Sequence, residues 1–140
     1  MSLYYSKPSG EGIYQKYKAI ASYTPKLFMF YNVPARTGRN IPAEVTLRLA
    51  RDVENLVAIK EASGDMVQCM QIIRDKPADF TVVSGDDMLT LAQIACGMQG
   101  VISVAANYLA RDLSSLVQAA LNDHHDEARR LLYNLMVALE

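Results

Sequence analysis

The stretch LVAIKEASG, residues 56–64, carries four apolar residues that lead directly to a lysine, Lys60. A short run of small and branched apolar residues is typical of a buried β-strand. A lysine at the end of such a strand is most often exposed to water. An amine held at the mouth of an apolar pocket is instead a nucleophile toward carbonyl carbon. The stretch therefore predicts a strand and leaves two roles open for Lys60.

Similar apolar runs recur along the chain and alternate with amphipathic helical segments. The predicted strands are 27–33, 56–60, 80–85 and 100–105, and the predicted helices between them are 10–24, 41–52, 65–75 and 87–97. Asn40 and Asp65 are expected to cap the second and third of these helices, and Gly97 to close the fourth. Segment 34–40 is expected to be a loop. After Asn107 the pattern changes to two helices, 110–123 and 125–140.

Composition predicts one soluble globular domain and excludes several partners. The 140 residues are 51% hydrophobic and 21% charged, and the formal charge is −1. Neither sign of charge runs in blocks, so we expect no binding to nucleic acid or to an anionic membrane. No apolar run reaches the roughly 20 residues of a membrane span. Cys69 and Cys96 have no metal-ligand spacing and are expected in the core, which indicates a reducing compartment, the cytoplasm.

Alternating strands and helices indicate an α/β fold built from parallel βα units. Two architectures fit this order: an open flavodoxin-like sheet, or part of a (β/α)8 barrel. Complete barrels need about 250 residues. Length alone therefore favours the open sheet.

Polar residues stand at the carboxyl end of all four predicted strands. They are Tyr31 and Asn32, Lys60 and Glu61, Ser84 to Asp87, and Ser103 with Asn107. The carboxyl ends of parallel strands share one edge, so one site is expected there. Simpler roles remain open for its members. Tyr31 could bury its ring in the core, and Arg36 could be a surface residue rather than a carboxylate ligand. Asp86 and Asp87 could be a metal pair, but helix capping is the commoner role for an acidic residue that opens a helix.

Four of these segments together resemble one family. They are YNVPARTG at 31–38, VAIKEASGD at 57–65, VVSGDD at 82–87 and GVISVAAN at 100–107, preceded by YYSKPSGEG at 4–12. In this order and spacing they resemble the dihydrodipicolinate synthase/N-acetylneuraminate lyase family. The resemblance implies a partial TIM (β/α)8 barrel, strands five to eight, and overrides the argument from length. It divides the chain into a half-barrel at 4–107 and C-terminal helices at 108–140. Residues 1–3, Met-Ser-Leu, are expected from the sequence itself to be a remnant of expression.

The resemblance also implies a chemistry that needs no cofactor. Lys60 matches the lysine that forms a covalent imine with pyruvate, and the resulting enamine attacks aspartate 4-semialdehyde to give 4-hydroxy-tetrahydrodipicolinate in lysine biosynthesis. Tyr31 and Tyr5 match the proton-relay tyrosines, the latter reaching in from a neighbouring subunit. Arg36 matches the arginine that holds the semialdehyde carboxylate. Gly85 and Ile102 match residues that line the pyruvate pocket.

The family's Gly-Thr-Thr-Gly-Glu motif has no counterpart in these 140 residues. The sequence is therefore expected to be a fragment that is weakly active or inactive alone. Another pyruvate-dependent aldolase of the same family and an inactive self-associating half-barrel are the alternatives. A half-barrel exposes strand edges and an apolar inner face, on which Ala58 and Val82 are expected. A homodimer or higher oligomer follows from that exposure.

Overall fold

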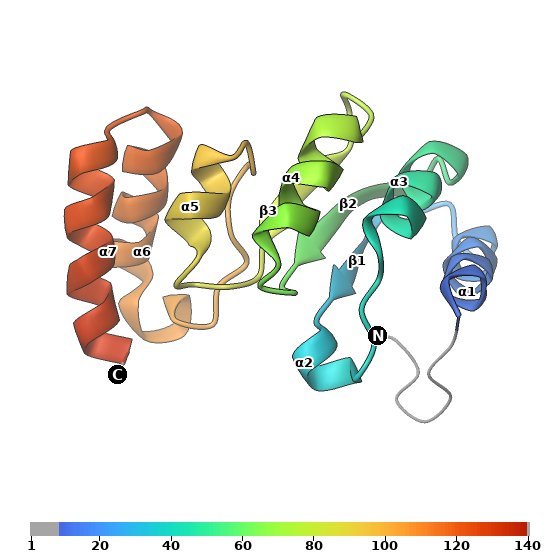
Figure 1. Ribbon diagram of the computed structural model, residues 1–140, viewed down its shortest axis with the longest axis horizontal. Helices are drawn as coiled ribbons and strands as arrows, with labels where there is room; N and C mark the ends of the chain where they lie inside the picture. Colours follow the sequence, from blue (N-terminus) through green and yellow to red (C-terminus); the bar gives the residue numbers. More distant parts are fainter. Residues whose placement is uncertain (1–8, 140) are drawn as a thin grey trace.

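The computed structural model describes residues 9–139 as an α/β chain in which strands and helices alternate (Figure 1). The strands are β1 (Phe28–Asn32), β2 (Leu56–Glu61) and β3 (Thr81–Ser84). The helices are α1 (Gly10–Ser22), α2 (Pro34–Thr37), α3 (Ala43–Asp52), α4 (Met66–Asp75), α5 (Thr90–Ala95), α6 (Ala106–Leu121) and α7 (His125–Leu139). The predicted α/β order is confirmed. Residues 1–3 and Tyr5 lie outside the described part of the chain.

The three strands form a parallel sheet in the order β1-β2-β3. Paired residues across it share a face, and the register places Tyr31 beside Lys60 and Asn32 beside Glu61. Lys60 in turn lies beside Val83. The carboxyl ends of neighbouring strands therefore meet at one edge, as the sequence predicted.

The predicted fourth strand, 100–105, is wrong in extent. Within the described residues only Val101 makes a bridge, to Ser84. The next residues are held by a side chain instead, since Asp87 Oδ2 accepts hydrogen bonds from the amides of Val104 (3.2 Å) and Ala105 (2.9 Å). The backbone thus leaves the sheet after a single pair and turns into α6.

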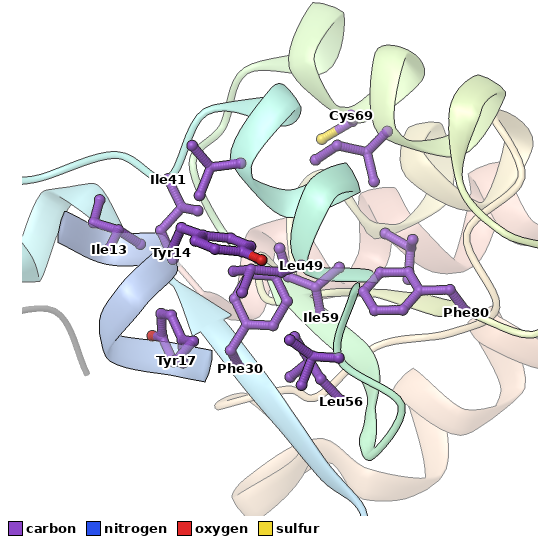
Figure 2. Close-up of a cluster of buried hydrophobic side chains, with 14 of the residues drawn as sticks. Ile13, Tyr14, Tyr17, Phe30, Ile41, Leu49, Leu56, Ile59, Cys69 and Phe80 are labelled. Atoms are coloured by element: carbon purple, nitrogen blue, oxygen red, sulfur yellow. The ribbon is translucent and has the colours of Figure 1, made fainter. Parts of the chain in front are cut away.

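One face of the sheet is covered and holds the main core. Phe30, Ile59 and Val82 are 2%, 0% and 0% exposed and pack against residues of α1, α3 and α4. Figure 2 shows Phe30 and Ile59 between Tyr17 of α1 and Phe80 before β3. Val82 was expected on the uncovered face, and this is wrong. Its partner in the sheet is Ile59, so both side chains point toward the helices.

The other face carries the residues that alternate with these. Met29 is 42% exposed, and Tyr31, Lys60 and Val83 are half-buried. Ala58 pairs with Met29 and so lies on the same face, as predicted. We call this the open face of the sheet, defined by Met29, Tyr31, Ala58, Lys60 and Val83.

Local capping decides where several helices begin and end. Asp65 caps α4 as predicted, its Oδ1 accepting from the amide of Gln68 at 3.0 Å. Asn40 does not cap the next helix, because α3 begins at Ala43 after Pro42. The predicted loop 34–40 contains the single-turn helix α2, which ends at Gly38 with φ of +66°. Gly97 follows α5 with φ of +108°, a conformation that suits glycine.

The last three helices form a separate layer beyond β3, with α6 and α7 side by side at one end of the molecule (Figure 1). Leu113, Leu116 and Leu135 form one small core between α6 and α7. Ile94 of α5 joins a second with Ala120 and Ala128. Among residues 9–139, no helix has both the length and the apolar character needed to cross a membrane.

Candidate functional site

Lys60 and Tyr31 form the centre of the candidate site at the carboxyl edge of the sheet. They are paired across β1 and β2, so their side chains leave the open face side by side. The Lys60 Nζ atom lies 4.4 Å from the centroid of the Tyr31 ring. This contact holds the amine against an aromatic face while both side chains remain half-buried. The amine is thus neither in the core nor free in water.

Gly85 gives the Lys60 side chain its space. A Cβ atom on Gly85 would lie 2.8 Å from Lys60 Cε, 3.1 Å from Lys60 Cγ and 2.7 Å from the Cβ of Ala62. The two approaches below 3.0 Å are too close for a real side chain, so any larger residue would displace both Ala62 and the lysine. The amide of Gly85 also donates to the carbonyl of Glu61 at 2.8 Å. Gly85 therefore belongs to the site through the close approach of its backbone.

The structure places the other predicted residues less centrally. Arg36 lies on α2, directly after β1, and its side chain is exposed. Ile102 is 41% exposed, and its amide donates to the carbonyl of Ser84 at 2.9 Å. Tyr5 lies outside the described residues. Lys60, Tyr31 and Gly85 are thus together, while Arg36 stands on the segment that follows β1 and Ile102 on the segment between α5 and α6.

The two acidic residues after β3 act on the backbone. Asp86 Oδ1 accepts from the amides of Met88 (3.0 Å) and Leu89 (3.2 Å), which stabilises the turn before α5. Asp87 holds the start of α6, as described above. Residues 9–139 contain no group of three or more His, Cys, Asp or Glu side chains arranged to hold a metal ion. Neither acidic residue is the N-cap of α5, which is Leu89 without a side-chain cap, so the capping role expected for them is wrong.

A buried polar network lies behind the site, on the covered face. The carboxylate of Glu61 is 0% exposed and receives hydrogen bonds from Asn32, Gln68 and the amide of Ser63. Asn40 joins Asn32 to Gln68. The sequence placed Asn32 and Glu61 at the strand ends but did not separate them from Tyr31 and Lys60. The alternation of side chains along a strand was the available signal, because successive residues point to opposite faces.

These features define a class: part of a parallel βα barrel that presents a lysine at the carboxyl end of a strand, where barrel enzymes carry their reactive groups. A family model described as the Dihydrodipicolinate synthetase family matches residues 2–139. The chain belongs to this family. The partial barrel, rather than the open sheet that length alone favours, is therefore its architecture.

Individual relatives agree with this membership. The 4-hydroxy-tetrahydrodipicolinate synthase of Flavobacterium psychrophilum is 48% identical over 140 residues, which is 100% of this chain and 48% of that relative. The crystal structure of dihydrodipicolinate synthase from Aquifex aeolicus has a TM-score of 0.93 at 38% identity, over 96% of this chain and 46% of that one. A chloride-inhibited dihydrodipicolinate synthase from Acinetobacter baumannii, complexed with pyruvate, has a TM-score of 0.87 at 36% identity, over 93% and 44%. This chain spans about half the length of these relatives.

Proposed function

We propose that this chain is the imine-forming part of a class I lyase that condenses pyruvate with aspartate 4-semialdehyde to 4-hydroxy-tetrahydrodipicolinate, a step of lysine biosynthesis. The observation that carries the proposal is the position of the Lys60 amine, over the Tyr31 ring and beside Gly85. Family membership supplies the reaction class, and one structural relative was crystallised with pyruvate. A cytoplasmic location stays a prediction from the sequence.

In this proposal Lys60 is the nucleophile. Its amine attacks the ketone carbon of pyruvate, and loss of water leaves a cationic imine. The imine withdraws electrons, so a methyl proton departs and the enamine carbon attacks the aldehyde carbon of the semialdehyde, whose oxygen takes up a proton. The amino group of the semialdehyde then attacks the imine carbon and displaces the Lys60 amine, which closes the ring and frees the lysine. The electron sink is the imine itself, and the reaction therefore needs no cofactor. Tyr31 would pass protons to and from the forming imine, in series with Tyr5.

The remaining residues would bind substrate. Arg36 is exposed on the loop beside Tyr31, where its planar guanidinium would hold the semialdehyde carboxylate by paired hydrogen bonds. Gly85 follows the end of β3, the amide of Ile102 bonds the last residue of that strand, and both residues would border the pyruvate. We propose residues 4–107 as the half-barrel that carries the site and 108–140 as the helical extension. Alone, the chain would be weakly active or inactive.

The experiment is reductive trapping. Purified chain is incubated with pyruvate and borohydride, digested, and analysed by mass spectrometry. One adduct at Lys60 is expected, and Lys60→Ala should remove it. Lys26, which is exposed, is the matched control, so Lys26→Ala should leave the adduct unchanged. Even labelling across the lysines, or an adduct that survives in Lys60→Ala, would contradict the proposal.

A second candidate, an inactive self-associating module, is favoured by the apolar side chains around the open face. Met29, Ile102 and Val104 are 42%, 41% and 59% exposed. Burying them between two copies would form a homodimer or a higher oligomer. Sedimentation at micromolar concentration tests this, with Met29→Glu expected to shift the chain toward monomer. A well-folded monomer that binds no hydrophobic dye would exclude the module.

A further inference from the structure

The network behind the site has an unusual composition for a covered sheet face. Elsewhere that face is apolar, with Phe30, Ile59 and Val82 at its centre. At its carboxyl edge it holds Glu61, 0% exposed, and Asn32, 1% exposed. A buried carboxyl group is costly unless its oxygens are fully hydrogen-bonded. An apolar pair would pack here without that cost, so the network calls for another explanation.

The two buried residues directly follow the two at the centre of the site. Asn32 follows Tyr31, and Glu61 follows Lys60. The pairs are in the same register, and the Asn32 Nδ2 atom lies 2.9 Å from Glu61 Oε2 and 3.2 Å from Oε1. A shift of one strand along the other would break this bond and would separate the Lys60 amine from the Tyr31 ring by the same distance. The hydrogen bond between Asn32 and Glu61 and the contact between Lys60 and Tyr31 therefore depend on the same register of β1 against β2.

The network also fixes both ends of the segment that carries Arg36. The amide of Ile41 donates to Asn32 Oδ1 at 3.0 Å, and Asn32 Nδ2 donates to Asn40 Oδ1 at 2.8 Å. Residues 33–39 thus form a loop closed by the side chain of the residue that precedes it. On the other side, Gln68 Nε2 donates to Glu61 Oε2 at 3.2 Å and ties the network to α4.

The directions of these hydrogen bonds are fully determined. Within the described residues, every partner of the Glu61 carboxylate is an N–H donor, from Asn32, Gln68 and Ser63. The Asn32 amide cannot turn over, because the amide of Ile41 requires oxygen at Oδ1. Position 61 must therefore offer acceptors alone, which only a carboxylate does among side chains of this shape.

We infer that Glu61 and Asn32 are positioning residues, which hold Lys60, Tyr31 and the Arg36 loop in the arrangement that imine chemistry needs. The expected effect on pyruvate trapping rests on the proposed function. The expected effect on the position of the Lys60 amine does not. The inference predicts that the position of the Lys60 amine depends on whether the side chain at position 61 accepts or donates hydrogen bonds. The size of that side chain and the stability of the core around it should matter less.

Glu61→Gln tests this with almost no change of shape. The new amide must accept from Ser63 with its oxygen, which leaves its NH2 facing the donors of Asn32 and Gln68. Asn32→Asp combined with Glu61→Gln reverses the network. The side-chain NH2 at position 61 then donates to the carboxylate at position 32, and the amides of Asn40 and Gln68 turn over to match. The double variant keeps the net charge and restores a partner to each group.

Three measurements are made on the 140-residue chain and its variants. The first is the rate of reductive trapping of pyruvate at Lys60. The second is the rate at which trinitrobenzenesulfonate labels Lys60 relative to exposed Lys26, which needs no pyruvate. The third is the thermal midpoint, with Ile72→Val as a control that loosens the core of α4 without touching a hydrogen bond of the network.

Glu61→Gln should slow trapping by about tenfold or more, the usual effect of losing a residue that orients a reactive group. Its Lys60 should also be labelled faster, approaching Lys26, as the amine leaves the Tyr31 ring. The double variant should recover both rates. Ile72→Val should change them only as far as its thermal midpoint shows that less of the chain is folded. Trapping by Glu61→Gln at the wild-type rate would overturn the inference. If the unmodified chain forms no adduct, the proposed function fails for this chain. An unchanged labelling ratio in Glu61→Gln would then still overturn the inference.

Discussion

The two faces of the sheet are built from alternate residues of the same strands, yet they differ in nearly every physical property. Phe30 and Ile59 on the covered face are 2% and 0% exposed and lie in the core. Tyr31 and Lys60, one residue further along each strand, are half-buried on the open face and contact each other. One face therefore contributes stability through apolar burial, and the other carries the residues proposed to react. The period of two residues in a strand makes this division possible.

The polar network is where the two faces are joined. Glu61 lies on the covered face, but it contributes hydrogen bonds rather than apolar area. Its backbone is also next to Lys60, so a change in its position is transmitted directly to the open face. Stability and chemistry are thus separable along most of the sheet and coupled at its carboxyl edge. The predictions below test this division, beginning with the largest expected effect.

Ile59→Ala should have the largest effect on stability. The side chain is 0% exposed among close-packed neighbours, and truncating such a residue lowers the free energy of unfolding by about 2–5 kcal/mol. Met29→Ala removes a side chain from the open face that is 42% exposed, and should change the free energy by about 0.5 kcal/mol or less. Urea unfolding followed by circular dichroism measures both.

If Ile59→Ala does not fold, Ile59→Val provides the same comparison at a smaller scale, about 0.5–1.5 kcal/mol. Equal losses from Ile59→Ala and Met29→Ala would contradict the distinction between the faces for the chain in solution. That result would mean that another surface covers Met29, and sedimentation of the same samples would show whether it is a second copy of the chain.

Gly85→Ala should have an intermediate effect that falls mainly on the open face. The added Cβ would meet Lys60 Cε at 2.8 Å and the Cβ of Ala62 at 2.7 Å. Overpacking of this kind costs about 1–3 kcal/mol of stability. Because the lysine chain is the more flexible neighbour, Lys60 should move, and trapping of pyruvate should fall by about 10–100-fold. Trapping at an unchanged rate would show that Lys60 does not need the space beside Gly85.

The positions of most strands and helices could be predicted from the sequence because they depend on local patterns. LVAIK has the composition of a strand, and Asp65 precedes a helix that it caps. The errors concern long-range contacts. Asn40 has the residue type of a cap, but bonds to Asn32 and Gln68 occupy its side chain. The face of Val82 depends on the register between β2 and β3, and local composition does not contain that register.

The candidate site was predicted unevenly for the same reason. The apolar run that ends in a lysine drew attention to Lys60, while the roles of Lys60, Tyr31, Arg36 and Gly85 came from the family resemblance and stay predictions. The space that Gly85 leaves for Lys60 could not be foreseen, since it depends on atoms from two strands. The donor directions that require a carboxylate at position 61 involve four separate segments, and so they also needed the structure.

The smallest effect concerns the covered face at high pH. Cys69 on α4 is 0% exposed, and burial, with a smaller contribution from the nearby charge of Glu61, raises the pKa of its thiol to about 11. In the unfolded chain a cysteine titrates near 8.5. Unfolding therefore releases a proton between these values. The stability contributed by the neutral thiol is complete below the unfolded pKa and is lost as pH rises through the folded one. Stability should therefore fall with rising pH within this window, and more steeply with this thiol than without it.

The measurement is the urea midpoint at several values between pH 8 and pH 11, for the wild type, Cys69→Ala and Cys96→Ala. Other groups titrate in this range, so the slope assigned to Cys69 is the difference between the wild type and Cys69→Ala. Cys96 is half-buried just beyond α5, and Cys96→Ala is the control for the removal of a thiol outside the core. Alkylation provides a second readout, because the buried thiol of Cys69 should react far more slowly than Cys96 at pH 8. A pH slope that is identical in all three chains would mean that Cys69 reaches water in the folded state. The covered face would then be less closed on its α4 side than the burial of Ile59 and Val82 indicates.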